Sequence, residues 1–203
     1  MQEVVHILFC KKNLHFLQQN DRFWSLICMN RMSDEDIVKG CIKGNEVACK
    51  QLYDTFAPQM MGVCMRYAGS VAEAQEVMHD GMMKVFRKLN TLKDYSRLKS
   101  WVYATVLNTA ITYASRQNHN VDFVEYVENI AVAQDYDVYE EEYLLKVIQS
   151  LPVRYRLVFN MHEIDGYSFE EIASELKLEP SSVRSILARA RKMLQEKLKD
   201  HER

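Results

Sequence analysis

Glycine and proline are scarce in this chain of 203 residues, which contains 6 glycines and 3 prolines. Both residues interrupt regular structure, so their scarcity favours long helices joined by few turns. No apolar run approaches the roughly 20 residues that cross a bilayer, and we expect no membrane insertion. Residues 4–10 are apolar, but no basic segment precedes them, which argues against a signal peptide.

Recognisable metal and catalytic motifs are also missing. The five cysteines form no C-x-x-C pair and no zinc spacing with histidine, so we expect no disulfide framework, metal or cofactor. Free thiols of this kind suit a reducing cytoplasm. A P-loop and a nucleophile elbow are absent as well, and we expect no catalytic residues. Glu76 and His79 do form Glu-x-x-His, but a di-iron site needs a second copy and two further Glu on facing helices, and the other copy, Glu3 with His6, lies outside the helical pattern.

Basic residues are absent from one long segment. Between residues 117 and 145 there is no Lys or Arg, whereas eight acids lie between Asp122 and Glu142. Helical apolar patterns stand on both sides of this segment. We therefore predict an all-α chain of two small helical domains, 32–117 and 143–203, joined by a flexible acidic linker over 118–142.

Residues 1–31 show no clear period, and a fresh helix start follows them. Ser33 is placed to cap a helix whose first turn holds Asp34, Glu35 and Asp36. We predict that 1–31 is an extension outside the fold, or not translated at all. The alternative is a short helix that binds a partner.

The most informative stretch runs from 166 to 194, GYSFEEIASELKLEPSSVRSILARARKML. Ser168 and Glu171 have the spacing of a capping box, and Pro180 suits the first position of the next helix. The three residues 177–179 form a turn so short that the two helices must cross. This pattern predicts a helix-turn-helix.

The outer face of the second helix is basic rather than mixed. Between Pro180 and Lys192 there are four basic residues and no acid. The first turns of such a helix reach base edges in the major groove, while hydroxyls and further cations hold phosphates. The candidate DNA-binding residues are Ser181, Ser182, Arg184, Ser185, Arg189 and Lys192.

A second basic segment lies between Lys84 and Arg116, where seven basic residues face one acid, Asp94. Aromatic residues are interleaved with these cations. Cations beside stacking surfaces are what single-stranded nucleic acid requires. For Trp101 the sequence leaves two interpretations open, a stacking surface for bases or a core residue.

Both segments resemble one protein family. The GYSFEEIA and SSVRSILARAR runs, the AQEVMHDGMMKVF run (74–86) and the YSRLKSWVYATVLNTAITYASR run (95–116) resemble bacterial sigma factors of the extracytoplasmic-function group. The four runs follow the family's order and spacing, and the likeness extends over nearly all of 33–198. Lys177 departs from the family, which often has Gly there; a left-handed Lys would cost about 1 kcal/mol.

The resemblance implies roles for particular residues. Segment 166–194 would read the minus-thirty-five element, and the helix around 74–86 would dock on RNA polymerase core through Glu76, His79 and Asp80. The minus-ten element would be held by residues from the second basic segment, namely Asn90, Asp94, Tyr95, Lys99, Trp101, Asn108 and Arg116. The implied partners are RNA polymerase core, promoter DNA and an anti-sigma factor, which in this family is often membrane-anchored.

Two questions stay open at this stage. A helix-turn-helix regulator that binds DNA without polymerase would explain 166–194 but not the second basic segment. The acidic linker has two interpretations. It is either a solvated tether or a mimic of RNA, because the family's linker threads polymerase channels that later hold RNA, which is also a polyanion.

Overall fold

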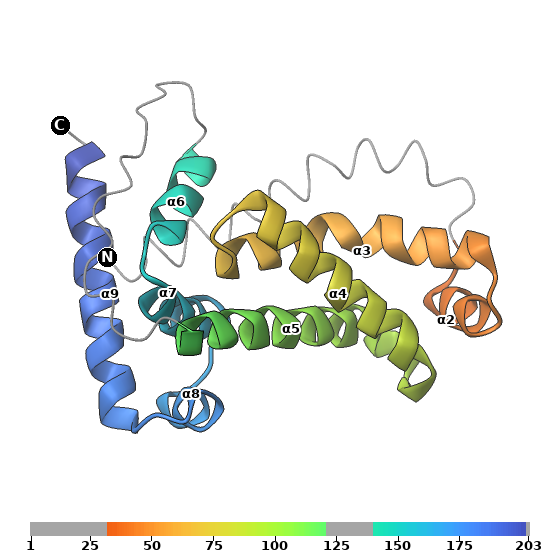
Figure 1. Cartoon of the computed structure of the whole chain (residues 1–203). Coiled ribbons are helices and arrows are strands. Elements are labelled where there is room, and N and C mark those ends of the chain that lie inside the picture. Colours follow the sequence, from red (N-terminus) through yellow and green to blue (C-terminus); the bar gives the residue numbers. More distant parts are fainter. Residues whose placement is uncertain (1–31, 121–139, 202–203) are drawn as a thin grey trace.

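The computed structural model describes residues 32–120 and 140–201, and every regular element in these two ranges is helical (Figure 1). The expected all-α fold is confirmed. The extension 1–31 and most of the predicted linker, 121–139, lie outside the described residues. Within the described ranges, no helix is both long enough and apolar enough to cross a membrane.

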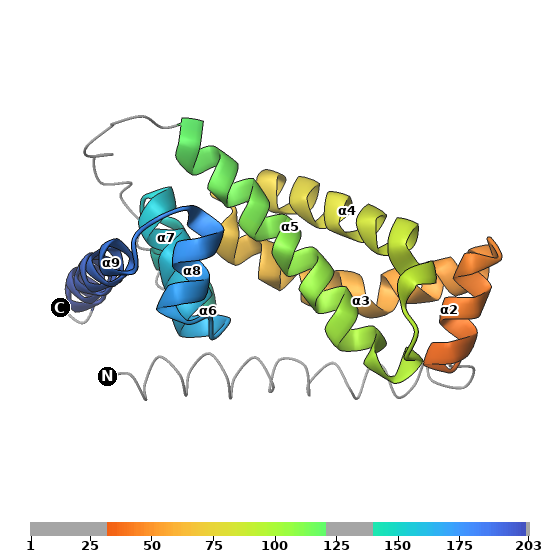
Figure 2. The ribbon, with the colours of Figure 1, turned by 90° about the horizontal axis from the view of Figure 1, so that it is seen from below.

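The N-terminal half contains four helices, α2 (Asp34–Ile42), α3 (Glu46–Tyr67), α4 (Val71–Lys88) and α5 (Leu98–Asn120). Ser33 caps α2 as predicted, because its side chain accepts a hydrogen bond from the Asp36 N–H. Helices α3, α4 and α5 pack against one another along their lengths, and α2 covers one end of α3 (Figures 1 and 2).

Helix α3 is longer than its apolar pattern indicated. The sequence shows separate apolar groups before and after Pro58, whereas the structure has one continuous helix with Pro58 inside it. A proline in a helix interior removes one hydrogen bond and costs about 3 kcal/mol. Burial of both groups, with Leu52 and Cys64 fully inaccessible to solvent, offsets this cost.

Two short 3₁₀ turns, η2 (Leu89–Thr91) and η3 (Tyr95–Arg97), connect α4 to α5. The Asp94 carboxylate accepts hydrogen bonds from the Ser96 N–H at 3.1 Å and from the Ser96 hydroxyl at 2.6 Å. These bonds, with Arg97 as a further contributor, hold the pKa of Asp94 below its usual value. The segment between α4 and α5 is therefore an ordered turn.

The C-terminal half contains α6 (Glu140–Gln149), α7 (Val153–Phe159), the π-helical turn η4 (Asn160–Ile164), α8 (Phe169–Leu176) and α9 (Pro180–His201). Ser168 and Glu171 form both bonds of the predicted capping box. Lys177 adopts the left-handed backbone conformation, with φ of 54°. Its conformational cost is therefore the predicted one of about 1 kcal/mol. Helices α8 and α9 cross as a helix-turn-helix, supported by α7 (Figure 1).

Glycine is required where α4 crosses α5. A Cβ atom on Gly81 would lie 3.1 Å from both methyl carbons of Val106, closer than most real contacts. The absence of a side chain at Gly81 therefore lets the two helices approach closely and sets their separation.

We predict that Gly81→Leu lowers the free energy of unfolding by about 1–3 kcal/mol, because it overpacks this crossing. Urea denaturation followed by circular dichroism measures the change. Gly62→Leu in α3 is the matched control, since a Cβ at Gly62 meets nothing within 4 Å. An equal loss of stability in both variants would contradict the explanation.

The two halves are packed together. Helices α6 and α7 lie against α3 and α5, and the buried apolar residues of both halves form one cluster (Figure 2). Composition suggested two bodies separated by a linker, and nothing in the sequence indicated this contact. The domain boundaries at 117 and 143 stay predictions.

Candidate nucleic-acid and polymerase interfaces

The predicted DNA-binding residues of the helix-turn-helix all lie on the solvent-facing side of α9. Ser182 is partly buried, and the remaining members are exposed: Ser181, Arg184, Ser185, Arg189 and Lys192. The opposite side of α9 carries Val183, Leu187 and Ala190 into the core. Helical spacing thus separates a core side from a basic, hydroxyl-bearing side.

Arg184 is held loosely against α8. Its guanidinium lies 5.2 Å from the centre of the Phe169 ring and 3.7 Å from a Glu170 carboxylate oxygen. More than half of both charged side chains is exposed, so this ion pair contributes at most about 1 kcal/mol. Arg184 is therefore free to exchange these contacts for a base edge.

Arg191 differs from its basic neighbours. Its guanidinium donates two hydrogen bonds to Glu163, a residue of η4 whose side chain is only 15% exposed. The pair joins α9 to the turn that precedes α8. Arg191 therefore has a structural role, although in sequence it belongs to the same basic run.

The minus-ten candidates between α4 and α5 form one exposed turn. Asn90 and Asp94 are exposed, and Tyr95 is half-buried, with the Lys39 ammonium 6.0 Å from the centre of its ring. Helix α2 packs against both 3₁₀ turns. The N-terminal helix thus supports the loop that the resemblance assigns to DNA.

Helix α5 presents the remaining minus-ten candidates on different sides. Trp101, Asn108 and Arg116 follow helical spacing along one side, with Trp101 half-buried against the core and the other two exposed. Lys99 lies two residues before Trp101, about 200° around the helix. The structure therefore does not place Lys99 beside Trp101.

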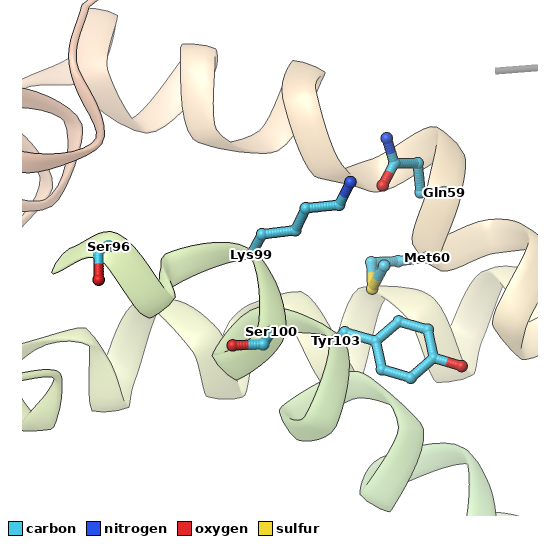
Figure 3. Close-up of a pocket in the computed structure, with 6 residues that line it drawn as sticks. All are labelled: Gln59, Met60, Ser96, Lys99, Ser100 and Tyr103. Carbon is cyan, nitrogen blue, oxygen red and sulfur yellow. The ribbon is translucent and has the colours of Figure 1, made fainter. Parts of the chain in front are cut away.

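Lys99 lines a hollow of about 400 Å³ between α3 and α5 (Figure 3). Its other lining residues are Gln59, Met60, Ser96, Ser100 and Tyr103. The Tyr103 ring forms one wall of this hollow, and its hydroxyl points toward the C-terminal half. This side of α5 therefore faces the contact between the two halves.

The predicted polymerase-docking residues form an acidic patch on α4. Glu76, His79 and Asp80 are all exposed and lie within one turn, at i, i+3 and i+4. A di-iron site needs its Glu-x-x-His to project into a bundle, so this outward orientation removes the basis for that alternative. Among the described residues, no group of three potential ligands is placed to hold a metal ion.

Sequence reasoning missed a polar cluster between the halves. Asp165, directly after η4, accepts hydrogen bonds from Arg66 at 3.1 Å, Tyr67 at 2.5 Å and Tyr103 at 2.8 Å. The Asp165 side chain is 0% exposed and that of Arg66 is 8% exposed. One signal in the sequence could have found it. Arg66 stands within an apolar helical run, and an arginine that such a run buries requires a buried partner.

The environment fixes the charge states in this cluster. Burial raises the pKa of Tyr67 well above its usual value, and the Asp165 carboxylate raises it further. Burial alone would lower the pKa of Arg66, but Asp165 and the two tyrosines outweigh it and the pKa is raised. Near neutral pH, Arg66 is therefore charged, and Tyr67 stays protonated and able to donate.

Comparison with known families agrees with this arrangement. Residues 52–120 match the family model for sigma-70 region 2, and residues 141–194 match the model for sigma-70 region 4. Together the two matches cover more than half of the chain. The first contains the minus-ten candidates and the acidic patch of α4, and the second contains the helix-turn-helix.

Curated relatives match most of the chain. The ECF RNA polymerase sigma-E factors of Escherichia coli strain K12 and Salmonella typhi are each 26% identical over 183 residues, covering 83% of this chain and 95% of the relative. The sigma-E factor of Haemophilus influenzae is also 26% identical, over 83% of this chain and 96% of the relative.

Two solved structures show limited similarity to this chain. One is the sigma factor RpoE of Bartonella quintana in complex with the anti-sigma factor NepR, at 22% identity and a TM-score of 0.46, covering 74% of this chain and 96% of that one. The other is CnrH with the cytosolic domain of CnrY, at 18% identity and a TM-score of 0.42, covering 82% and 97%. From the two region models and the named relatives, the chain belongs to the sigma-70 family of RNA polymerase sigma factors, in the extracytoplasmic-function group.

Proposed function

We propose that this sigma factor, which binds RNA polymerase core and directs promoter-specific transcription initiation, uses three separate surfaces. The acidic patch of α4, Glu76, His79 and Asp80, docks on core. The turn from Asn90 to Tyr95 and the Trp101 side of α5 hold the unpaired minus-ten strand. The basic side of α9 reads the minus-thirty-five duplex.

The observation that carries this assignment is the separation of charge over the surface. The exposed acids Glu76 and Asp80 lie in the middle of α4, whereas cations and hydroxyls occupy the exposed side of α9 from Ser181 to Lys192. A polyanion is attracted to the second surface and repelled by the first. A surface that docks on a basic protein and another that docks on DNA would have these properties.

A regulator that binds DNA without polymerase would have no use for the α4 patch or the α5 surface. We expect weak DNA binding by the free protein and strong, promoter-specific binding once core is added. Mapping transcription starts after overexpression would identify the promoters. Tight operator binding by the protein alone, unchanged by core, would contradict the proposal.

Trp101 is proposed to stack on an unpaired base through the part of its ring that the core leaves open. Stacking contributes about 1–3 kcal/mol per base, so Trp101→Ala should slow promoter opening on duplex DNA by roughly fivefold to 150-fold. On a template with a pre-melted bubble, most of the activity should return.

The competing interpretation is that Trp101 is only a core residue. In that case Trp101→Ala would lower the thermal midpoint strongly and the bubble would restore nothing. Circular dichroism of the variant is therefore measured beside transcription on both templates. The control is the same substitution at Trp24, which belongs to the predicted N-terminal extension and lies outside the described residues. We expect the pre-melted bubble to change the activity of Trp24→Ala no more than it changes the activity of the wild type.

We assign no catalytic residue to this chain, since nucleotide chemistry belongs to the polymerase. We further propose that it acts in the cytoplasm, where polymerase and DNA are found. The family resemblance adds an anti-sigma partner to this proposal. Co-purification of a tagged chain under non-inducing conditions, followed by mass spectrometry, tests that part independently of promoter recognition.

A further inference from the structure

Two cysteines meet where α2 joins α3. Cys41 is the next-to-last residue of α2, and Cys49 is the fourth residue of α3. Both side chains are partly exposed, whereas Cys64 farther along α3 is fully buried. Reagents in solution can therefore reach the pair but not Cys64.

The backbones of the two helices touch beside these cysteines. Gly40 and Ala48 directly precede Cys41 and Cys49, and a Cβ atom on Gly40 would lie 2.6 Å from the Ala48 Cβ, closer than real contacts allow. The turn between the helices is held by a hydrogen bond from the Asn45 N–H to the Gly40 carbonyl at 2.9 Å. Backbones this close lie within the range that a disulfide bridges, about 4–7 Å between Cα atoms.

The two thiols interact with each other. Burial raises the pKa of the Cys41 thiol to about 12, and a hydrogen bond with Cys49 and the charge of Cys49 contribute to this rise. Hydrogen bonding acts only over contact distances, so the two side chains are neighbours. Because a thiolate and not a thiol attacks a disulfide, Cys41 stays unreactive near neutral pH until Cys49 has reacted.

Helix α2 supports the turn that the proposed function assigns to the minus-ten element. It packs against both 3₁₀ turns, η2 and η3, as well as against α3 (Figure 2). The Lys39 ammonium, two residues before Cys41, lies 6.0 Å from the centre of the Tyr95 ring. The position of α2 on α3 therefore determines how Tyr95 and its turn are supported.

We propose that Cys41 and Cys49 form a redox modification site, which a low-molecular-weight disulfide converts into a covalent link between α2 and α3. In a reducing cytoplasm the pair stays as two thiols. When small disulfides such as oxidised glutathione accumulate, the link fixes α2 beneath the turn that contains Tyr95. Only the consequence for promoter binding rests on the proposed minus-ten surface.

The chemistry consists of two successive thiol–disulfide exchanges. The Cys49 thiolate attacks one sulfur of the small disulfide, whose S–S bond breaks, and the first small thiolate leaves and takes up a proton. Cys49 then carries no charge, which removes its contribution to the raised pKa of Cys41. The Cys41 thiol loses its proton to water, its sulfur attacks Cys49, and the second small thiolate leaves and is protonated. The protein loses two electrons and two protons, and the small disulfide gains them.

The link should stabilise the folded chain. Cys49 follows Cys41 by eight residues, so the disulfide closes a short loop and removes conformations from the unfolded chain. For a chain of this length we expect the thermal midpoint to rise by about 5 °C on oxidation. Dithiothreitol reduces the disulfide and should return the midpoint to its original value.

Peptide mapping of the full-length chain tests the site. The protein is incubated with oxidised glutathione, free thiols are blocked with iodoacetamide, and the chain is digested with trypsin. Trypsin cuts after Lys39, Lys43 and Lys50, which places the two cysteines in separate peptides, 40–43 and 44–50. We expect mass spectrometry to find these peptides as one linked species in most molecules. Glutathione is preferred to a peroxide, which would also oxidise methionines.

Cys49→Ser is the matched variant, since it removes one sulfur at almost constant size. It should give no linked species and no rise in the thermal midpoint. Cys64, in peptide 51–66, is the internal control and should react with iodoacetamide only after the chain is denatured. Replacement of Cys10 and Cys28 by Ser should leave the link intact. If Cys49→Ser does not fold, the map of the wild-type chain carries the test.

The proposal is overturned if both cysteines stay reduced, if each retains a separate glutathione, or if they link to Cys10 or Cys28 instead. A link that leaves the thermal midpoint unchanged would contradict the fixation of α2. Neither measurement depends on promoter recognition, so failure of the link leaves the proposed function standing. A chain that forms the link but shows no minus-ten dependence in transcription would contradict the proposed function alone.

Discussion

A chain carrying Glu76→Lys and Asp80→Lys should no longer co-purify with RNA polymerase core. Both side chains are exposed on the same side of α4, and neither takes part in packing, whereas Val77 and Gly81 of the same helix are buried. Juxtaposed like charges cost several kcal/mol at an interface, so we expect core affinity to fall at least about a hundredfold. Helical content should stay unchanged.

The same change in net charge can be made elsewhere as a control. Glu46 and Asp54 are exposed acids on a different helix, α3, and if the α4 patch is the docking surface, converting both to Lys should leave core binding within about threefold of wild type. If the α3 variant loses core binding to the same extent, net charge rather than the α4 patch is responsible. Retention of core by the α4 variant would exclude the proposed docking surface.

Replacement of Arg184 by Ala should weaken promoter binding by about 1–3 kcal/mol, which is roughly fivefold to 150-fold, and should relax base preference within the minus-thirty-five element. Arg184 is in the second turn of α9, where a recognition helix reaches base edges. The present contacts of Arg184 with Glu170 and Phe169 are exposed and weak, so stability should change little.

Lys192→Ala gives the comparison that separates base reading from phosphate binding. Lys192 is exposed and lies two turns farther along α9, close to Glu196 at 3.9 Å. Its loss should weaken binding equally for all sequences and reduce the salt dependence by about one counterion. Selection of promoters from a randomised minus-thirty-five library, carried out for both variants, measures the difference. An unchanged preference in the Arg184 variant would rule out its role in reading bases.

Local structure could be predicted from the sequence because its causes are local. The Ser168–Glu171 capping box, Pro180 at the start of α9 and the crossing of α8 and α9 follow from caps, turn residues and apolar spacing within about thirty residues. The outward placement of Glu76, Asp80 and Arg184 follows equally, since the period of a helix fixes which side faces the core.

Some residues that appear equivalent in sequence were separated by tertiary structure. Arg184 and Arg191 belong to one basic run, yet Arg191 is bound to Glu163 while Arg184 stays exposed. Lys99 and Trp101 are two residues apart, yet they face opposite sides of α5. The sequence predicts on which side of its helix each of these residues lies. It does not predict the neighbours from distant segments that decide the role of each side chain.

The sequence by itself determined the all-helical fold, the helix-turn-helix and the family, because each depends on short-range periodicity and on runs of adjacent residues. Only the tertiary structure decided how the two halves meet. Arg66 and Asp165 are 99 residues apart. No local pattern specifies a pairing over that distance. It arises because an arginine carried into the interior by an apolar helix requires a carboxylate there, and the turn after α7 supplies one.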